Sequence, residues 1–230
     1  RIWNIAPLPA DEFFARALRA MWAELGGRIT GRVRDGATPP NALPLAGIDS
    51  PPLAQVIRDI NKYSNNVMAR QLFLTLGNGA GTPADTATAD AAVRAWATRR
   101  GLALPSLMLD NGSGLSRSER LSAADMAALL RHAWASSVMP EFMSSMPVLS
   151  VDGTLRRRLR NSPASGQAHL KTGSLSDTRS IAGYVLDRNG QRVLMVAWLN
   201  HPNAGRAQPV LEALLEWVWA GNRQSFPVTE

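Results

Sequence analysis

Apolar residues recur at helical spacing over most of the first 140 positions of the chain. The stretches that predict helices in this way are 9–25, 52–61, 64–77, 85–100 and 122–135. Residues typical of helix termini support these bounds. Pro9 precedes the first stretch and Gly26-Gly27 follows it, and Ser122 with Asp125 three residues later comes close to a capping box. The first part of the chain is therefore predicted to be mainly helical.

Strand patterns are concentrated in the last third of the chain. Residues 167–175 predict a strand, and two apolar runs within 179–200 flank Arg188-Asn189-Gly190, which is typical of a hairpin turn. A last apolar stretch, 204–221, predicts a helix that covers the sheet. Shorter patterns predict a strand and turn at 28–36, a strand at 43–48, and a strand that runs into a Gly-rich turn at 106–117. The order predicts an α+β fold, with helices packed on one antiparallel sheet.

Composition narrows the chemistry. The 230 residues include no cysteine, which excludes thiol catalysis and disulfides, and the three histidines show no metal-ligand spacing, so no metal is expected. No run of about 18 apolar residues predicts a membrane span. The net charge of +7 could attract an anionic polymer or membrane face, or could simply reflect an arginine-rich composition. Both interpretations stay open on charge alone.

Lysine is rare in this chain, and its position is informative. Only Lys62 and Lys171 occur among 25 basic residues, and Lys171 opens the sequence Lys-Thr-Gly on a predicted strand. There an ammonium and the hydroxyl of Thr172 occupy adjacent positions, and Gly173 leaves room for a ligand backbone. The backbone N–H of Ser174 can then point at a developing oxyanion. This combination suits a carboxylate next to an acyl centre.

A second motif precedes the first by 107 residues. Ser64-Asn65-Asn66 has the form Ser-x-Asn at the start of a predicted helix, where a serine could equally serve as a simple N-cap. Penicillin-recognising serine enzymes combine Ser-x-x-Lys, Ser-Asp-Asn and Lys-Thr-Gly. The chain has forms of the second and third in the expected order. The ordered pair is more specific than either motif alone.

With these motifs in view, the chain resembles the C-terminal part of a class C penicillin-binding protein of the D-alanyl-D-alanine carboxypeptidase/endopeptidase family. The resemblance covers about residues 50–220. It is carried by "SPPLAQVIRDINKYSNNVMARQLF", "DNGSGLSR", "VDGTLRRRL" and "AHLKTGSLSDTRSIAGYV". It implies a β-lactamase/transpeptidase-like α+β sandwich, present here only in part. Residues 1–50 would end an inserted domain or lead into residues 51–230, the C-terminal part of the penicillin-binding domain.

The resemblance also implies roles for single residues. Ser64 would relay a proton to the leaving amine, and Asn66 would hold the acyl side chain and the catalytic lysine. Lys171 would lower the barrier of the proton relay and attract the terminal carboxylate of the substrate. Thr172 would bind that carboxylate, and the backbone N–H of Ser174 would help to form the oxyanion hole.

The nucleophile of the family lies in a Ser-x-x-Lys motif, in which the lysine takes the proton of the serine. Asp59 and Ala168 stand three residues before the two lysines, so the motif does not occur in these 230 residues. The resemblance therefore implies a fragment that is inactive alone. An inactive homologue that binds wall peptides is the alternative, and the sequence does not say whether the missing part was cleaved or never present.

The resemblance implies partners and a location as well. The expected partners are the stem peptide of peptidoglycan, β-lactam antibiotics and the missing N-terminal part of the same protein, without nucleic acid or cofactor. It also allows peripheral contact with a membrane and a homodimer. The expected location is the periplasm or the outer face of the bacterial cytoplasmic membrane.

Other functions remain open from the sequence. A class A β-lactamase would need a Glu-x-x-x-Asn pattern between the two motifs, and it is absent after both Glu119 and Glu141. A non-catalytic basic module that binds cell wall or nucleic acid rests on charge alone. Carboxypeptidase and endopeptidase activity are not distinguished.

Overall fold

The computed structural model describes residues 7–44, 46–79 and 83–222, and it divides the chain into two units, Arg1–Asp49 and Ser50–Glu230. In the first unit α1 spans Ala10–Glu24, close to the predicted helix. The strand predicted at 28–36 is wrong, and the described residues of 43–48 form no strand either. These stretches are almost entirely exposed, so the alternating pattern has no neighbouring strand or core to pack against.

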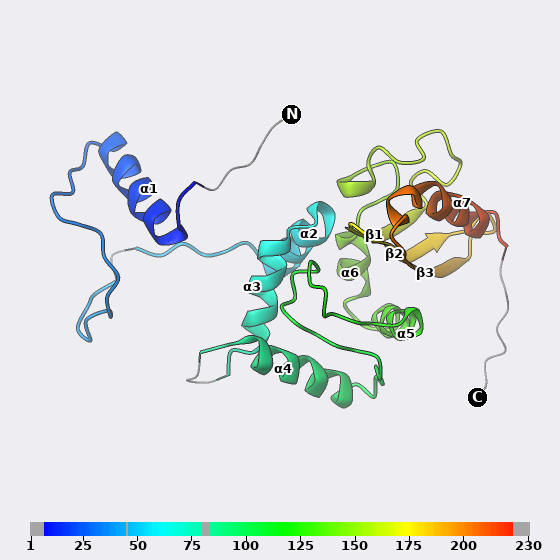
Figure 1. Cartoon of the computed structure of the whole chain (residues 1–230), viewed down its shortest axis with the longest axis horizontal. Coiled ribbons are helices and arrows are strands. Elements are labelled where there is room, and N and C mark those ends of the chain that lie inside the picture. Colours follow the sequence, from blue (N-terminus) through cyan, green and yellow to red (C-terminus); the bar gives the residue numbers. More distant parts are fainter. Residues whose placement is uncertain (1–6, 45, 80–82, 223–230) are drawn as a thin grey trace. The chain divides into compact units, whose positions relative to one another are not determined.

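The second unit contains the remaining helices and the sheet (Figure 1). Its elements in chain order are α2 Leu53–Tyr63, α3 Asn66–Leu76, α4 Thr86–Arg99, α5 Ala123–Trp134, α6 Met139–Ser145, η1 Gly153–Leu155, β1 Ala168–Leu175, β2 Thr178–Leu186, β3 Arg192–Asn200, η2 Ala204–Arg206 and α7 Gln208–Trp219. The predicted helices of this unit are confirmed within a few residues at each end. The cap at Ser122 is also confirmed, since its side chain accepts the N–H of Asp125.

The three strands form one antiparallel sheet in the order β1-β2-β3. Lys171 lies opposite Ala182, which in turn lies opposite Val196. The predicted hairpin turn is confirmed between β2 and β3, where Gly190 has the left-handed φ of 76° that such a turn requires. The α+β prediction is therefore confirmed.

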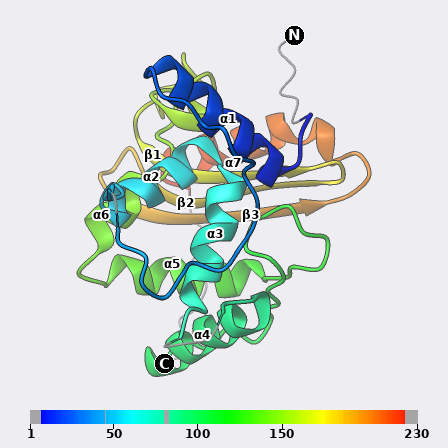
Figure 2. The same cartoon turned by 90° about the vertical axis from the view of Figure 1, so that its left-hand side faces the viewer.

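Each face of the sheet covers a separate core. On one face α7 packs its buried Leu211, Leu215 and Val218 against β2 and β3. On the other face Tyr184 lies fully buried beside α5 and α6, and its hydroxyl donates to Leu130 O at 2.7 Å. Figure 2 shows α5 below the strands and α7 above them. The prediction that the last helix covers the sheet is thus confirmed.

No helix in the described part of the chain is long and apolar enough to cross a membrane.

Two segments differ from the prediction. The strand expected within 106–117 is only an isolated bridge between Met108 and Arg120, because the rest of that stretch folds back on itself in a loop. The seven-residue helix α6 was not predicted, since it is too short to show a helical apolar period. Both segments lie next to the candidate site, where local contacts replace regular secondary structure.

Candidate active site

The junction between α2 and α3 presents Ser64 and Asn66. Ser64 ends α2 in a left-handed conformation, with φ 52° and ψ 49°. The side chain of Asn65, rather than that of Ser64, caps α3 by accepting the N–H of Met68 at 3.1 Å. The N-cap interpretation of Ser64 is therefore wrong, and its hydroxyl is left for another partner. A left-handed conformation costs a serine about 1–2 kcal/mol, so the surrounding contacts must hold it.

Lys171 provides that partner from β1. Its Nζ donates to Ser64 Oγ at 2.5 Å and to the carbonyl oxygen of Thr172 at 2.8 Å, so that residues 107 positions apart meet. Burial lowers the pKa of the Lys171 amine, because a charged amine loses hydration there. An amine that gives up its proton readily beside a hydroxyl is suited to proton transfer.

The outer edge of β1 is open beside Lys171. At the start of the strand, Leu170 donates to Pro147 O and Leu149 donates to Ala168 O, both at 2.9 Å. Because the direction of backbone groups alternates along an antiparallel strand, the N–H and C=O of Thr172 and Ser174 face this same edge. No described strand pairs with the edge at 171–175. An extended peptide could add to it as another strand.

The side chains of the Lys-Thr-Gly sequence have different neighbours. Thr172 Oγ1 lies 3.3 Å from Thr154 Oγ1 in η1, so two hydroxyls stand together. At Gly173 an added Cβ would lie 2.4 Å from Ser180 Oγ on β2. A larger residue would therefore have to displace the Ser180 hydroxyl, which can rotate away, so the neighbouring strand favours glycine without requiring it.

A loop from 110 to 120 supports the other side of the site. Asn66 Nδ2 donates to Ser113 O at 2.5 Å, and Glu119 Oε1 accepts the N–H of Asn111 at 3.3 Å and of Gly112 at 3.1 Å. Gly112 has a φ of 69°, and an added Cβ would lie 2.4 Å from Phe73 Cβ. The loop thus contacts Asn66 directly through Ser113.

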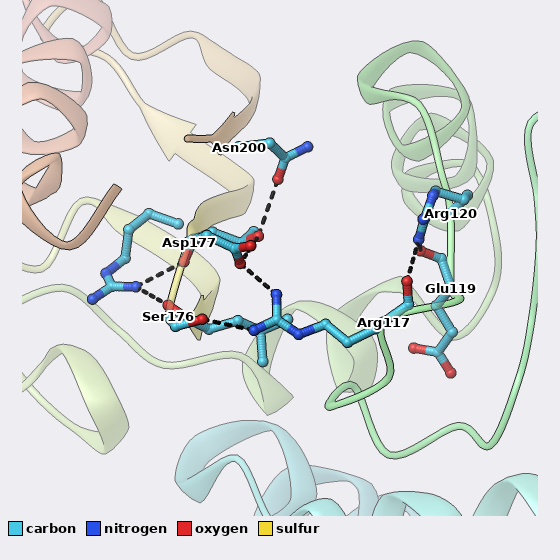
Figure 3. A network of polar contacts seen from close by, with 9 residues as sticks. Arg117, Glu119, Arg120, Ser176, Asp177 and Asn200 are labelled. Carbon is cyan, nitrogen blue, oxygen red and sulfur yellow. Dashed lines mark hydrogen bonds and ion pairs between the residues drawn. The ribbon is translucent and has the colours of Figure 1, made fainter. Parts of the chain in front are cut away.

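The same loop is tied to the turn that follows β1 (Figure 3). Arg117 donates to Ser176 Oγ at 2.7 Å and pairs with Asp177. Both partners of the ion pair are about half exposed, so the pair contributes little to stability. Its effect is to keep the loop close to the end of the Lys-Thr-Gly strand.

Lys62, which carried no role in the sequence analysis, is 4% exposed. Its Nζ donates to Met146 O at 2.7 Å and to Asp152 Oδ2 at 2.6 Å. Asp152 and Thr154 both belong to "VDGTLRRRL", which supported the resemblance without indicating any contact. No group of three or more His, Cys, Asp or Glu among the described residues could hold a metal.

Comparisons with known proteins identify the family of the chain. A model of the D-Ala-D-Ala carboxypeptidase 3 (S13) family matches residues 4–217. The D-alanyl-D-alanine carboxypeptidase DacB of Haemophilus influenzae is 27% identical over 198 residues, which are 85% of this chain and 41% of that protein. The D-alanyl-D-alanine carboxypeptidase of Actinomadura sp. strain R39 is 30% identical over 210 residues, or 86% of this chain and 37% of that protein. The chain spans about two fifths of these relatives.

Solved structures show the same fold. Penicillin binding protein 4 (dacB) from Haemophilus influenzae superposes with a TM-score of 0.81 at 26% identity, over 93% of this chain and 50% of that one. A penicillin G-acylated predatory endopeptidase from Bdellovibrio bacteriovorus superposes with a TM-score of 0.57 at 17% identity, over 99% of this chain and 63% of that one. At this lower identity the likeness concerns the fold alone.

Proposed function

Because the chain belongs to the D-Ala-D-Ala carboxypeptidase 3 (S13) family, we propose that it forms the substrate-gripping and proton-relay side of a serine DD-peptidase site. The substrate would be the D-Ala-D-Ala end or the cross-link peptide of peptidoglycan, and β-lactams would acylate the enzyme. The observation that carries the proposal is the contact between Lys171 Nζ and Ser64 Oγ, beside an open strand edge.

The open edge suggests how a peptide would bind. A stem peptide that lies antiparallel to 171–175 would exchange backbone hydrogen bonds with Thr172 and Ser174. Its terminal carboxylate would meet the ammonium of Lys171 and the hydroxyl of Thr172, and the N–H of Ser174 would face the scissile carbonyl. Asn66 would contact the acyl side chain of the substrate, while its Nδ2 keeps one hydrogen on Ser113 O.

Proton transfer would use Ser64 as a relay. A serine hydroxyl attacks the carbonyl carbon of the penultimate D-Ala, the C–N bond to the last residue breaks, and an ester forms. The leaving amine takes a proton from Ser64 Oγ. Ser64 Oγ regains a proton from the group that accepted the proton of the nucleophilic serine. The 2.5 Å contact with Lys171 would stabilise the charge that develops on Ser64 Oγ. Water then hydrolyses the ester.

The nucleophile itself is proposed to lie outside these 230 residues, because neither lysine follows a serine by three positions. The chain alone would then be inactive. One observation favours a second candidate: Ser64 and Lys171 form a hydroxyl–amine pair with a lowered amine pKa, which is how a serine nucleophile can be activated. Acylation of Ser64 in the chain alone would support that candidate.

The proposal extends to location and to β-lactams. We place the protein in the periplasm or at the outer face of the cytoplasmic membrane, where peptidoglycan is found. β-Lactams are expected to act as inhibitors, because the Glu-x-x-x-Asn pattern of class A β-lactamases is absent. Rapid turnover of a chromogenic β-lactam would favour a β-lactamase instead.

The test is the release of D-alanine from an acyl-D-Ala-D-Ala peptide by a longer protein that adds a Ser-x-x-Lys region to this chain. The Ser64→Ala and Lys171→Met variants are expected to lose about 10²-fold or more in rate, as for other groups that act in acid–base catalysis. Arg94→Met, which removes an exposed ion pair on α4, is the control and should leave the rate unchanged. Full activity of the Lys171→Met enzyme would refute the proposal.

A further inference from the structure

Lys62 is a buried cation that the proposed chemistry does not use. It lies in the last turn of α2, two residues before Ser64, and its two partners are Met146 O and Asp152 Oδ2. The ammonium of Lys62 is buried while the side chain of Asp152 is 37% exposed. Taking a charge out of water is costly, and apolar residues of the same volume are often as stable. The charge at this position is therefore better explained by the geometry it enforces than by stability.

The contacts of Asp152 continue toward β1. Its Oδ1 accepts the N–H of Val148 at 2.8 Å, within the segment 147–149 that pairs with the start of β1. A continuous path of hydrogen bonds thus runs from the end of α2, through Lys62 and Asp152, to the strand that carries Lys171.

The backbones at this point are also in close contact. Gly153 has a φ of 54°, and an added Cβ would lie 2.5 Å from the carbonyl oxygen of Lys62. The neighbouring Asn61 donates to Ser145 Oγ at 2.8 Å, and Thr154 stands beside Thr172. The segment that receives the Lys62 ammonium therefore also borders the Lys-Thr-Gly strand.

We propose that Lys62 is a positioning residue, which together with Asp152 holds the end of α2 against β1 so that Ser64 meets Lys171. The effect on catalysis rests on the proposed function. The claim that Lys62 and Asp152 hold Ser64 near Lys171 does not depend on it. Asp152 also balances the charge of Lys62, which leaves Lys171 as the one lysine of the chain without a carboxylate partner in the structure. A substrate carboxylate would then find a single ammonium at the strand edge.

The rarity of lysine makes a direct test practical. When the 230-residue chain is labelled with [¹³Cε]lysine, only Lys62 and Lys171 give NMR signals, and the Lys62→Met variant leaves the signal of Lys171 alone. We expect that signal to move toward the position of free lysine in Lys62→Met, and its pKa to rise toward the ordinary value. Asp152→Asn, which keeps the shape of the site, should produce a smaller change in the same direction.

The matched control is Arg158→Met, which removes an ion pair with Glu212 of comparable burial on the side of α7. It should lower the melting temperature without moving the Lys171 signal. A Lys62→Met chain that is folded by near-UV circular dichroism and keeps the parent's Lys171 shift and pKa would overturn the proposal. If that variant does not fold, the Asp152→Asn variant decides by the same criterion.

A second readout uses a longer protein with a Ser-x-x-Lys region. Lys62→Met should slow acylation by penicillin on the order of 10²-fold while the reversible affinity changes little, as expected when reacting groups are misplaced by about 1 Å. Equal losses of affinity and rate would contradict a positioning role. If the parent is not acylated at all, the proposed function fails, whereas the NMR result still decides whether Lys62 positions Ser64.

Discussion

Replacing Gly153 by alanine tests the contact between η1 and the end of α2. Gly153 has a left-handed φ of 54°, and the new Cβ would lie 2.5 Å from Lys62 O and 3.1 Å from Pro147 Cβ. The first of these neighbours is backbone and belongs to a helix that is held by the Lys62–Asp152 pair. A side-chain rotation therefore cannot relieve the clash, and η1 must move away from α2.

Two costs add in this variant. A left-handed conformation costs alanine about 1–2 kcal/mol, and overpacking of a tight contact costs a further 1–3 kcal/mol or so. The two ranges add to about 2–5 kcal/mol, with a midpoint of about 3.5 kcal/mol. For a chain of this size, 1 kcal/mol corresponds to about 2–4 °C, so the melting temperature should fall by roughly 10 °C.

Gly166→Ala is the matched control for this measurement. Gly166 has a similar left-handed φ of 74°, but nothing lies within 4 Å of its added Cβ. This variant bears only the cost of the left-handed conformation, so its melting temperature should fall by roughly 5 °C by the same conversion. Thermal unfolding followed by circular dichroism compares the two variants. Equal melting temperatures would refute the argument that η1 and the end of α2 are in enforced contact.

Three further outcomes follow from the same structure. Because burial lowers the pKa of the Lys171 amine, the parent should gain stability relative to Lys171→Met as pH rises from that lowered pKa toward the ordinary pKa of lysine, and a difference in melting temperature that does not change with pH would contradict this. Burial raises the pKa of Tyr184 to about 12, so alkaline absorbance titration of a Tyr63→Phe variant should show one midpoint there rather than near 10. Because the unfolded state releases that proton first, stability should fall between about pH 10 and 12. Glu119→Ala should remove hydrogen-exchange protection from two amides of the 110–120 loop, and unchanged protection would count against its bracing role.

Local signals were sufficient for most elements of the fold. The helices have recognisable ends, such as Gly26-Gly27 after the first helix and the cap at Ser122, and the hairpin has an Asn-Gly turn. The strand expected at 28–36 failed because an alternating pattern needs a neighbouring strand, which the sequence of one segment does not reveal. The same limitation applies to 106–117, where the backbone is satisfied by side chains of the loop itself.

The candidate site was predictable only in part. Ser64 and Lys171 follow from two motifs, and the structure brings them together at 2.5 Å. The contacts of Asp152 and Thr154 depend on how η1 packs against α2 and β1, which no local pattern encodes. Lys62 could have been noticed as one of two lysines in an arginine-rich chain, but its burial and its carboxylate partner are properties of the tertiary structure.

The central claim is that this chain holds one side of a divided serine-peptidase site. Its most direct test is intact mass spectrometry after treatment with a penicillin, on the 230-residue chain and on a longer protein that includes Ser-x-x-Lys. The account predicts a penicilloyl adduct on the longer protein only, lost when its motif serine is replaced and slowed in Lys171→Met. An adduct on the 230-residue chain, abolished by Ser64→Ala, would contradict it and identify Ser64 as the nucleophile.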